Sequence, residues 1–343
     1  MTGTTVPPDV VDLDVTFRAI DSGLSVANRV PDIFAAAWPA YRSWFLREGE
    51  QARDSYAVGA YQLRRHMPEL VGTYDRLVAA VGGGDLEARF LSHWSPPPLV
   101  AACSLAAWNR QENLLVRNYD YPPLLCDTTV LASQWNGTRV LAMSDCVWGA
   151  IDGMNEHGLA VAIAFGGRKV VGSGFGVPLV VRYLLETCET TGEARATLRR
   201  LPYHLAHTLT IVDAGGDVCT AYIAPDRDVI LTSAVVATNH QGRVEWQEHA
   251  RATKSVERET ELERLVAESP TAARFVDGFL QPPLFAVDGN RRLGTLYTVA
   301  YHVREARAEF RWPDGTWEQR FGAFSEGVRV VELARGEETL ATG

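Results

Sequence analysis

Lysine is nearly missing from this sequence, and so is any stretch rich in positive charge. The 343 residues include 33 lysines and arginines, of which only Lys169 and Lys254 are lysines, and 42 acidic residues, and the net charge of −9 is spread along the chain. A nucleic-acid-binding protein needs a basic face, so the composition argues against that class. No apolar run reaches the length of a membrane span, and residues 1–15 lack the basic start and apolar run of a signal peptide. We expect a cytoplasmic protein that binds neither nucleic acid nor membrane.

Cysteine is sparse and never occurs in a Cys-X-X-Cys spacing. The five cysteines are Cys103, Cys126, Cys146, Cys188 and Cys219. This scatter predicts neither a zinc site nor a disulfide framework. No metal-ligand pattern is formed by His157, His204, His207, His240 and His249, and no GxGxxG or GxxxxGK[ST] loop is present to hold a nucleotide phosphate. We therefore expect no metal ion and no cofactor.

The residues that are abundant suit a folded globular chain. Hydrophobic residues make up 46% and charged residues 22%, which is enough for one large or two modest folded units. From about residue 31 to residue 90, apolar residues recur at spacings of three and four, and this predicts amphipathic helices. Three successive prolines at 96–98 cannot continue a helix and mark a boundary. We predict a mainly helical leader at 1–102 and a second region at 103–343.

The second region begins with alternating apolar and polar residues, which is typical of β-strands. Three successive hairpins are predicted, with turns at 109–112, 136–138 and 155–158, and Asn136-Gly137 is the strongest of these turn signals. The segments that follow are helices at 177–188 and 191–201, strands at 207–225 and 228–240, helices at roughly 253–280, and strands at 294–312 and 316–324. This order of elements predicts an α+β fold in which two antiparallel sheets lie between helical layers.

Cys103 lies at the junction between these two regions, in the stretch AACSLAAW. A cysteine among alanines and leucines is more often a small buried residue than a nucleophile. The position allows a second interpretation, because a cut before Cys103 would leave an otherwise complete domain that begins with cysteine. A freed N-terminal cysteine carries a nucleophile and also, in an α-amine whose pKa is near ~8, a base that can take the thiol proton.

Four motifs in chain order, AACSLAAW, LLVRNYDY, GMNEHGLAVA and VVATNH, resemble those of a known enzyme family. They are similar to the penicillin (isopenicillin N) acyltransferase group of the N-terminal nucleophile (Ntn) hydrolases, which are relatives of the choloylglycine hydrolases and penicillin V acylases. The leader motifs HMPELV, ARFLSHW and PPPLVAAC extend the resemblance toward the N-terminus. The resemblance implies a four-layer αββα sandwich of two antiparallel sheets.

The resemblance also implies an inactive precursor that cuts itself. The break would fall between Ala102 and Cys103 and yield an α chain of residues 1–102 and a β chain of residues 103–343. Two positions depart from the family pattern, since relatives often carry glycine where this chain has Ala102 and glutamine where it has Leu105. The Cβ of alanine makes backbone strain harder to accept than in glycine, which bears on the N-to-S acyl shift that such cleavage needs.

Arg117 and Asp120, in LLVRNYDY, are the next candidates. With a period of two, their side chains leave opposite faces of the strand, so we expect a bend at Tyr121-Pro122-Pro123 if both are to reach one cysteine. An ion pair that closes the hairpin explains the same residues without catalysis. The family resemblance implies that Asp120 lies beside the nucleophile's amine and raises its pKa, and that Arg117 holds the thiol as thiolate.

Three further residues are candidates by the same resemblance. Asn239 ends the run SAVVATN, and it would donate its side-chain amide to the oxyanion of a tetrahedral intermediate, a contact worth on the order of 3 kcal/mol. An ordinary strand-end turn is the alternative for this residue. Asn155 belongs to a predicted hairpin turn and Arg258 to a charged helix face, so both have structural explanations as well.

These residues support three hypotheses for the function. In the first, a self-cleaved Ntn enzyme uses Cys103 to attack a linear amide of a small N-acyl compound, and water releases the acyl group. In the second, the same enzyme transfers an acyl group to an amine in secondary metabolism, with a coenzyme A thioester as donor. In the third, the chain stays uncut and binds ligands without catalysis. We favour hydrolysis, with an αβ heterodimer after cleavage and the question of a higher homo-oligomer left open.

Overall fold

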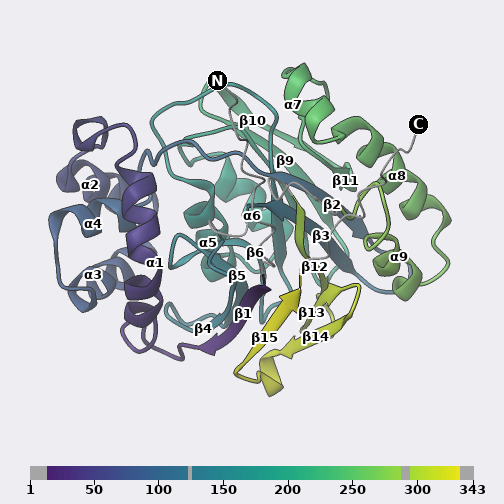
Figure 1. Ribbon diagram of the computed structural model, residues 1–343, viewed down its shortest axis with the longest axis horizontal. Helices are drawn as coiled ribbons and strands as arrows, with labels where there is room; N and C mark the ends of the chain where they lie inside the picture. The colour runs from purple at the N-terminus through teal and green to yellow at the C-terminus, as the bar shows by residue number, and fades with distance from the viewer. Residues whose placement is uncertain (1–13, 123–125, 287–293, 333–343) are drawn as a thin grey trace, which may run out of the picture.

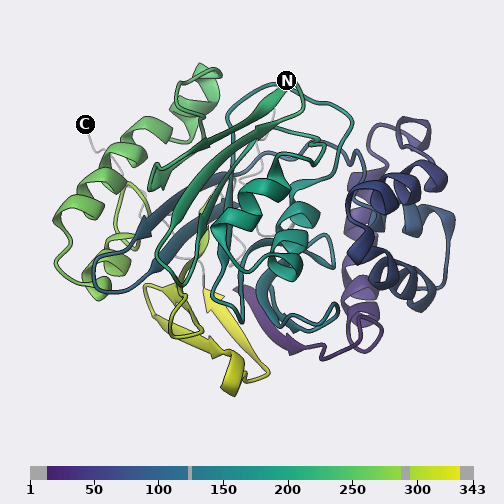
Figure 2. The same ribbon diagram turned by 180° about the vertical axis from the view of Figure 1, so that it is seen from behind.

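The computed structural model describes residues 14–122, 126–286 and 294–332. Two β-sheets pack face to face, and helices cover the outer side of each sheet (Figure 1). A further group of helices from the leader lies beside this sandwich, and it is clearest from behind (Figure 2). The predicted α+β fold with four αββα layers is therefore confirmed. In the described ranges, no helix has the length and apolar character that crossing a membrane requires.

The nine-stranded sheet has the order β10-β9-β8-β7-β6-β5-β4-β1-β15. Its strands are β1 (Asp14–Asp21), β4 (Thr129–Ser133), β5 (Val140–Asp145), β6 (Gly149–Asn155), β7 (Ala160–Phe165), β8 (His207–Val212), β9 (Val218–Ala224), β10 (Arg227–Thr232) and β15 (Gly327–Glu332). The pairing is antiparallel except between β1 and β4, which run parallel. A parallel pair needs a long crossover connection, and residues 22–128, which include the helices of the leader and two strands of the other sheet, supply it.

The six-stranded sheet has the order β11-β2-β3-β12-β13-β14 and is antiparallel. Its strands are β2 (Ala102–Trp108), β3 (Leu114–Tyr121), β11 (Val236–Ala237), β12 (Gly294–His302), β13 (Arg307–Trp312) and β14 (Gly315–Arg320). Every residue of β2 and β3 is buried, since one face packs on the other sheet and the opposite face is covered by helices. The hairpin that carries Cys103 thus lies in the buried interior of the sandwich.

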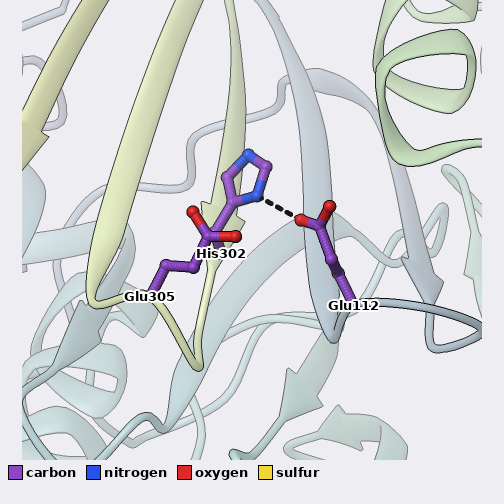
Figure 3. A group of neighbouring side chains, drawn as sticks. All are labelled: Glu112, His302 and Glu305. Atoms are coloured by element: carbon purple, nitrogen blue, oxygen red, sulfur yellow. Dashed lines mark hydrogen bonds and ion pairs between the residues drawn. The ribbon is translucent and has the colours of Figure 1, made fainter.

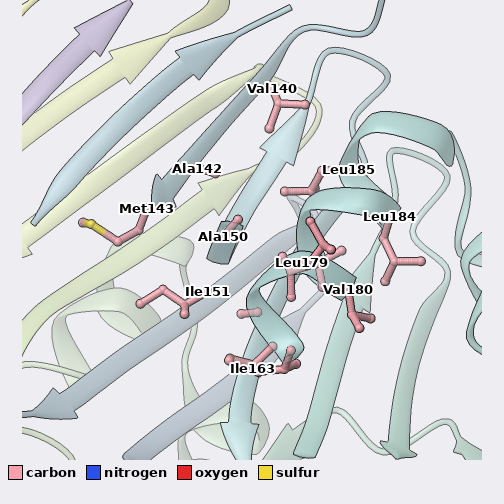
Figure 4. Packing of buried hydrophobic residues seen from close by; sticks show 14 of the residues in the cluster. Val140, Ala142, Met143, Ala150, Ile151, Ile163, Leu179, Val180, Leu184 and Leu185 are labelled. Atoms are coloured by element: carbon pink, nitrogen blue, oxygen red, sulfur yellow. The ribbon is translucent and has the colours of Figure 1, made fainter. Parts of the chain in front are cut away.

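Helices cover both outer faces of the sandwich. The nine-stranded sheet carries α5 (Val177–Thr187) and α6 (Thr191–Leu198), and the helices on the side of the six-stranded sheet are α7 (Gln247–Ala252), α8 (Ser255–Glu268) and α9 (Ala272–Gly278). Leu179, Val180, Leu184 and Leu185 lie at helical spacing and are fully buried. Figure 4 shows these residues of α5 in the same packed layer as apolar residues of β5, β6 and β7. This packing explains why the sequence VPLVVRYLLET forms a helix on the sheet.

The leader contains a strand in addition to its helices. The helices are α1 (Val30–Phe45), α2 (Tyr56–His66), α3 (Val71–Ala80) and α4 (Asp85–Leu91). The sequence did not predict β1, which inserts between β4 and β15 by backbone hydrogen bonds. A chain break after Ala102 would therefore leave the leader attached to the sheet.

Candidate active site

Cys103 is the second residue of β2 and lines a cavity bounded by both sheets and the leader. Its side chain is buried, and the residue is 1% exposed. The cavity has a volume of about 70 Å³, which is room for more than one water molecule. Its walls are mainly apolar, and the leader contributes Trp44, Phe90, His93, Pro96, Pro97, Leu99 and Ala101. A buried thiol thus lines a mainly apolar cavity that a small molecule can share with it.

Arg117 contacts the sulfur of Cys103 from the neighbouring strand. In the β2–β3 pairing Cys103 lies opposite Tyr119, so the alternation of side chains puts Arg117 on the same face as the thiol. Nη2 of Arg117 lies 3.4 Å from Sγ of Cys103, and the guanidinium sits over the ring of Tyr119 at 4.4 Å from its centroid. Burial raises the pKa of the Cys103 thiol, and the charge of Arg117 opposes this rise. A cation in this place is suited to stabilise a thiolate.

Asp152 holds Arg117 in this position, and sequence reasoning missed it. The carboxylate of Asp152, on β6, forms an ion pair with Nη1 of Arg117, and both side chains are fully buried. The hydroxyl groups of Tyr297 and Tyr301 donate hydrogen bonds to the same carboxylate, the first at 2.6 Å. A signal was available, because Asp152 is the one charged residue in the otherwise uncharged strand GAIDGMN, and a buried charge needs a partner.

A second network reaches the backbone nitrogen of Cys103. Oδ1 of Asn239 accepts a hydrogen bond from the Cys103 N–H at 3.0 Å and another from Nη2 of Arg258 at 2.6 Å. Nη1 of Arg258 donates to Asp120 at 2.8 Å, and the hydroxyl of Thr295 donates to the other oxygen of that carboxylate at 2.7 Å. Burial raises the pKa of the Asp120 carboxyl, and the charge of Arg258 opposes this rise. Arg258 thus links the aspartate to the asparagine beside Cys103.

A bend at Tyr121-Pro122-Pro123 was expected only if Arg117 and Asp120 were both to reach one cysteine, and Asp120 makes no direct contact with Cys103. β3 keeps its regular pairing with β2 through Asp120, while Pro123 lies outside the described residues. The two charged residues leave opposite faces of the strand, as the period of two predicts, and approach Cys103 from different sides. Arg117 contacts the sulfur, whereas Asp120 connects to the backbone nitrogen through the second network.

The side-chain amide of Asn239 is engaged with the chain just before Cys103. Nδ2 donates to the carbonyl oxygen of Ala101 at 3.3 Å and to that of Phe165 at 3.2 Å. Ala101 is separated from Cys103 by one residue, so this amide lies next to the peptide bond between Ala102 and Cys103. In the continuous chain, Asn239 therefore holds groups on both sides of that bond.

Comparison with known families identifies the family of the chain. The sequence profile of a family described as acyl-coenzyme A:6-aminopenicillanic acid acyl-transferase matches residues 108–317, which is more than half of the chain. The chain belongs to this family. The matched range includes Arg117, Asp120, Asn239 and Arg258 and begins shortly after Cys103. The protein is accordingly an enzyme of the Ntn amidohydrolase and acyltransferase type.

Several solved structures are similar to this member of the acyl-transferase family. Penicillin V acylase from Agrobacterium tumefaciens is 13% identical, with a TM-score of 0.46 over 68% of this chain and 92% of that chain. A mutant of conjugated bile acid hydrolase from Clostridium perfringens is 12% identical, with a TM-score of 0.47 over 68% and 97%. An N-acylethanolamine-hydrolyzing acid amidase orthologue from Caenorhabditis elegans is 15% identical, with a TM-score of 0.44 over 63% and 98%. No curated protein sequence matches the chain significantly.

Asn155 has structural contacts in this acyl-transferase family member. Its side-chain amide donates to the carbonyl oxygens of Leu185 and Cys188 at the end of α5, at 3.0 and 2.7 Å. Its side-chain oxygen accepts the N–H groups of His157 and Leu159, each at 3.1 Å, within the turn between β6 and β7. These bonds use the side chain to join the turn to the helix, so we leave Asn155 out of the group around Cys103.

Glu112, His302 and Glu305 form a cluster with the composition of a metal site (Figure 3). The strand register places His302 level with Leu114 and Trp108, at the opposite end of β2 from Cys103. Nδ1 of His302 lies 2.8 Å from a carboxylate oxygen of Glu112. Arg307 contacts two of the three residues, with Nη2 at 2.8 Å from the same Nδ1 and Nε at 3.0 Å from Glu305. Each carboxylate of the cluster thus has a partner within the protein, His302 for Glu112 and Arg307 for Glu305, so we interpret this cluster as an ion-pair network.

Proposed function

We propose that the chain cleaves itself between Ala102 and Cys103 and that the freed Cys103 hydrolyses a linear amide of a small N-acyl compound. The observation that carries this proposal is the double contact of Cys103. Its sulfur lines the cavity beside Arg117, while its backbone nitrogen, the future α-amine, is bonded to Asn239. One residue can then supply both nucleophile and base.

Self-cleavage would begin with the thiol of Cys103 adding to the carbonyl carbon of Ala102. The bond from that carbon to the Cys103 nitrogen breaks, the nitrogen takes up a proton, and a thioester to sulfur remains. Water hydrolyses the thioester and leaves a carboxylate at Ala102, a free thiol and a free α-amine. Both Ala102 and Cys103 are buried in a paired strand, so the precursor holds the reacting groups in a restricted geometry.

The same groups would then act on a substrate. The α-amine takes the proton of the Cys103 thiol, the charge of Arg117 stabilises the thiolate, and the sulfur attacks the amide carbon. Release of the Ala101 carbonyl frees the Asn239 amide to donate to the oxyanion, while Arg258 keeps that side chain in place. The departing amine takes a proton, and water hydrolyses the acyl-cysteine to regenerate the thiol.

The cavity supports hydrolysis of a small compound over transfer from a coenzyme A thioester. A coenzyme A donor carries several phosphate charges and calls for basic side chains near the pocket. Among the described residues that line the cavity, Arg117 is the one lysine or arginine, and its charge is paired with Asp152. The apolar walls suit a short acyl or amine group. Acyl transfer remains the second candidate because the family's description names it.

Intact-mass spectrometry of the freshly purified protein beside the Cys103→Ala variant tests the cleavage. We expect two chains, ending at Ala102 and starting at Cys103, in the parent protein alone, with Cys188→Ala, another buried cysteine, as the cleaved control. A single full-length mass in every sample would contradict self-cleavage and favour a binding protein. Assays on a panel of linear amides before and after alkylation with iodoacetamide then test whether the freed thiol is the nucleophile.

A further inference from the structure

We propose that Asp145, which lies beside Asp127, forms an anionic subsite of the Cys103 cavity that binds a primary ammonium group of the substrate. The inference rests on the proposed function in one respect, namely that this cavity holds the substrate. Asp145 and Cys103 line the same cavity. An ammonium group at Asp145 and a carbonyl group at the sulfur can therefore belong to one small molecule. The substrate class is an amide whose acyl or amine part carries an amino group.

The two carboxylates meet at one phenol of the leader. Asp145 ends β5 and Asp127 lies just before β4, and the hydroxyl of Tyr41 on α1 is 2.5 Å from Asp127 and 3.1 Å from Asp145. A phenol has one proton, so it can donate to only one of the two carboxylates at a time. The backbone N–H of Val147 donates to Asp127 at 2.9 Å. The carboxylate of Asp145 can therefore accept further hydrogen bonds. Asp145 is 4% exposed and lines the cavity.

The carboxylate pair has no counter-ion in the part of the chain that the structure describes. Among the described residues, no lysine, arginine or histidine forms an ion pair with Asp127 or Asp145. The two buried arginines near Cys103 pair with other carboxylates, Arg117 with Asp152 and Arg258 with Asp120. Burial and the neighbouring Asp127 raise the pKa of Asp145 to about 7. A buried carboxylate without a cation is costly, and a ligand that carries a positive charge removes that cost.

His93 gives a second, independent indication of a ligand with N–H groups. It lines the same cavity, is 3% exposed, and its Nε2 has no hydrogen-bond partner among the described residues. Burial lowers the pKa of His93 to about 3, so the imidazole is neutral and one ring nitrogen can accept a hydrogen bond. Phe90 and Tyr119 also line the cavity, and the faces of aromatic rings attract cations. Acid, neutral imidazole and aromatic rings are the groups that recognise an ammonium ion.

Binding of small ligands to the uncut Cys103→Ala protein tests the subsite without requiring cleavage or catalysis. The probes are propylammonium, propanol and propionate, which match in length and differ in charge, and the measurement is calorimetry at neutral pH. We expect propylammonium to bind at least about tenfold more tightly than either of the others. Asp145→Asn, made in the same background, should abolish this preference. The matched control is Asp75→Asn, which removes one charge from an exposed site on α3 and should leave the preference intact.

The outcomes separate this inference from the proposed function. Equal or tighter binding of propanol or propionate, no binding of propylammonium at millimolar concentration, or a preference that survives Asp145→Asn would each overturn the subsite. The comparison of the three probes in the Cys103→Ala protein decides the matter even if the Asp145→Asn variant does not fold. Failure of the parent protein to cleave itself would contradict the proposed function and leave this binding result unchanged.

Discussion

Nη2 of Arg117 lies 3.4 Å from the sulfur of Cys103, and no part of the Arg117 side chain reaches solvent. A buried cation is stable only when another group balances its charge, and the carboxylate of Asp152 does so from the facing sheet. The contact to the cysteine therefore depends on a residue from a different sheet. This makes Asp152 a positioning residue that acts on the thiol through Arg117.

Replacing Arg117 with methionine should affect stability and thiol chemistry in separable ways. Arg117→Met leaves the Asp152 carboxylate buried without its partner, so we expect a loss of about 3–5 kcal/mol in the free energy of unfolding. The double variant Arg117→Met/Asp152→Asn removes both charges and should recover most of that loss. Urea unfolding measures the stability of the three proteins.

The reactivity of Cys103 should not recover with the stability. Without the Arg117 charge the pKa of the thiol is higher, so alkylation by iodoacetamide at neutral pH should be slower in both the single and the double variant. Mass mapping of the alkylated cysteine follows this rate. A double variant that is as reactive as the parent would show that Arg117 serves the fold alone.

Ala102 should limit the rate of self-cleavage. Ala102→Gly removes the Cβ and eases the strained backbone that an N-to-S acyl shift needs, a difference on the order of 1–3 kcal/mol, so we expect cleavage at least several-fold faster. Ala102→Val adds a β-branched side chain at a buried position and should slow it. The cleaved fraction is followed by intact mass after synthesis. Ala106→Gly, in the same strand, is the control, and an equal acceleration there would point to general loosening of β2.

Arg258 should matter through its two simultaneous contacts. Arg258→Lys keeps the charge, but a single ammonium cannot reproduce the planar fork that joins Asp120 to Asn239. We expect kcat on an amide substrate to fall on the order of a hundredfold with a smaller change in KM, because Asn239 loses its orientation toward the oxyanion. Arg264→Lys, on the exposed side of the same helix, should leave both constants unchanged. A fall confined to KM would contradict a role in the chemical step.

The sequence predicted the features that local pattern determines. The turns at 109–112, 136–138 and 155–158 all lie between consecutive paired strands, and Gly137 and Gly158 have the positive φ angles that such turns need. The alternation along β3 also assigned Arg117 and Asp120 to opposite faces correctly. These features depend on residues close together in the chain, so periodicity and turn chemistry were enough to find them.

The missed features depend on contacts between distant segments. Asp152 contacts Arg117 across the two sheets, and its tyrosine partners come from β12. These residues are far apart in the sequence, so the spacing of residues along the chain could not predict the contacts. Strand β1 carries no distinctive local pattern, and its parallel pairing with β4 depends on a connection of more than a hundred residues that contains the leader helices and strands β2 and β3. The second network was predicted only in part. The family resemblance named Arg258 and Asn239, but the hydrogen bonds between them are seen only in the folded chain.

The Asp127–Asp145 pair should make the folded protein less stable as pH rises. The pKa of Asp145 is raised to about 7 in the folded state from a usual value near ~4, so the folded protein binds a proton that the unfolded chain releases. The stabilising effect of this proton is fully present below pH ~4 and is lost as pH rises through about 7. Asp145→Asn does not titrate, so its stability relative to the parent should increase by on the order of 1 kcal/mol per pH unit across this window.

Urea unfolding from pH 5 to pH 8, in the uncut Cys103→Ala background, measures this difference. The buried histidines act in the opposite direction, because burial lowers the pKa values of His93 and His207 to about 3 and stability is then lost as pH falls below ~6.5. Their contribution is common to both proteins and cancels when the variant is compared with its parent at each pH. A stability difference that stays constant from pH 5 to pH 8 would contradict this prediction, because it would mean that Asp145 is not the carboxyl that holds the proton in the folded protein.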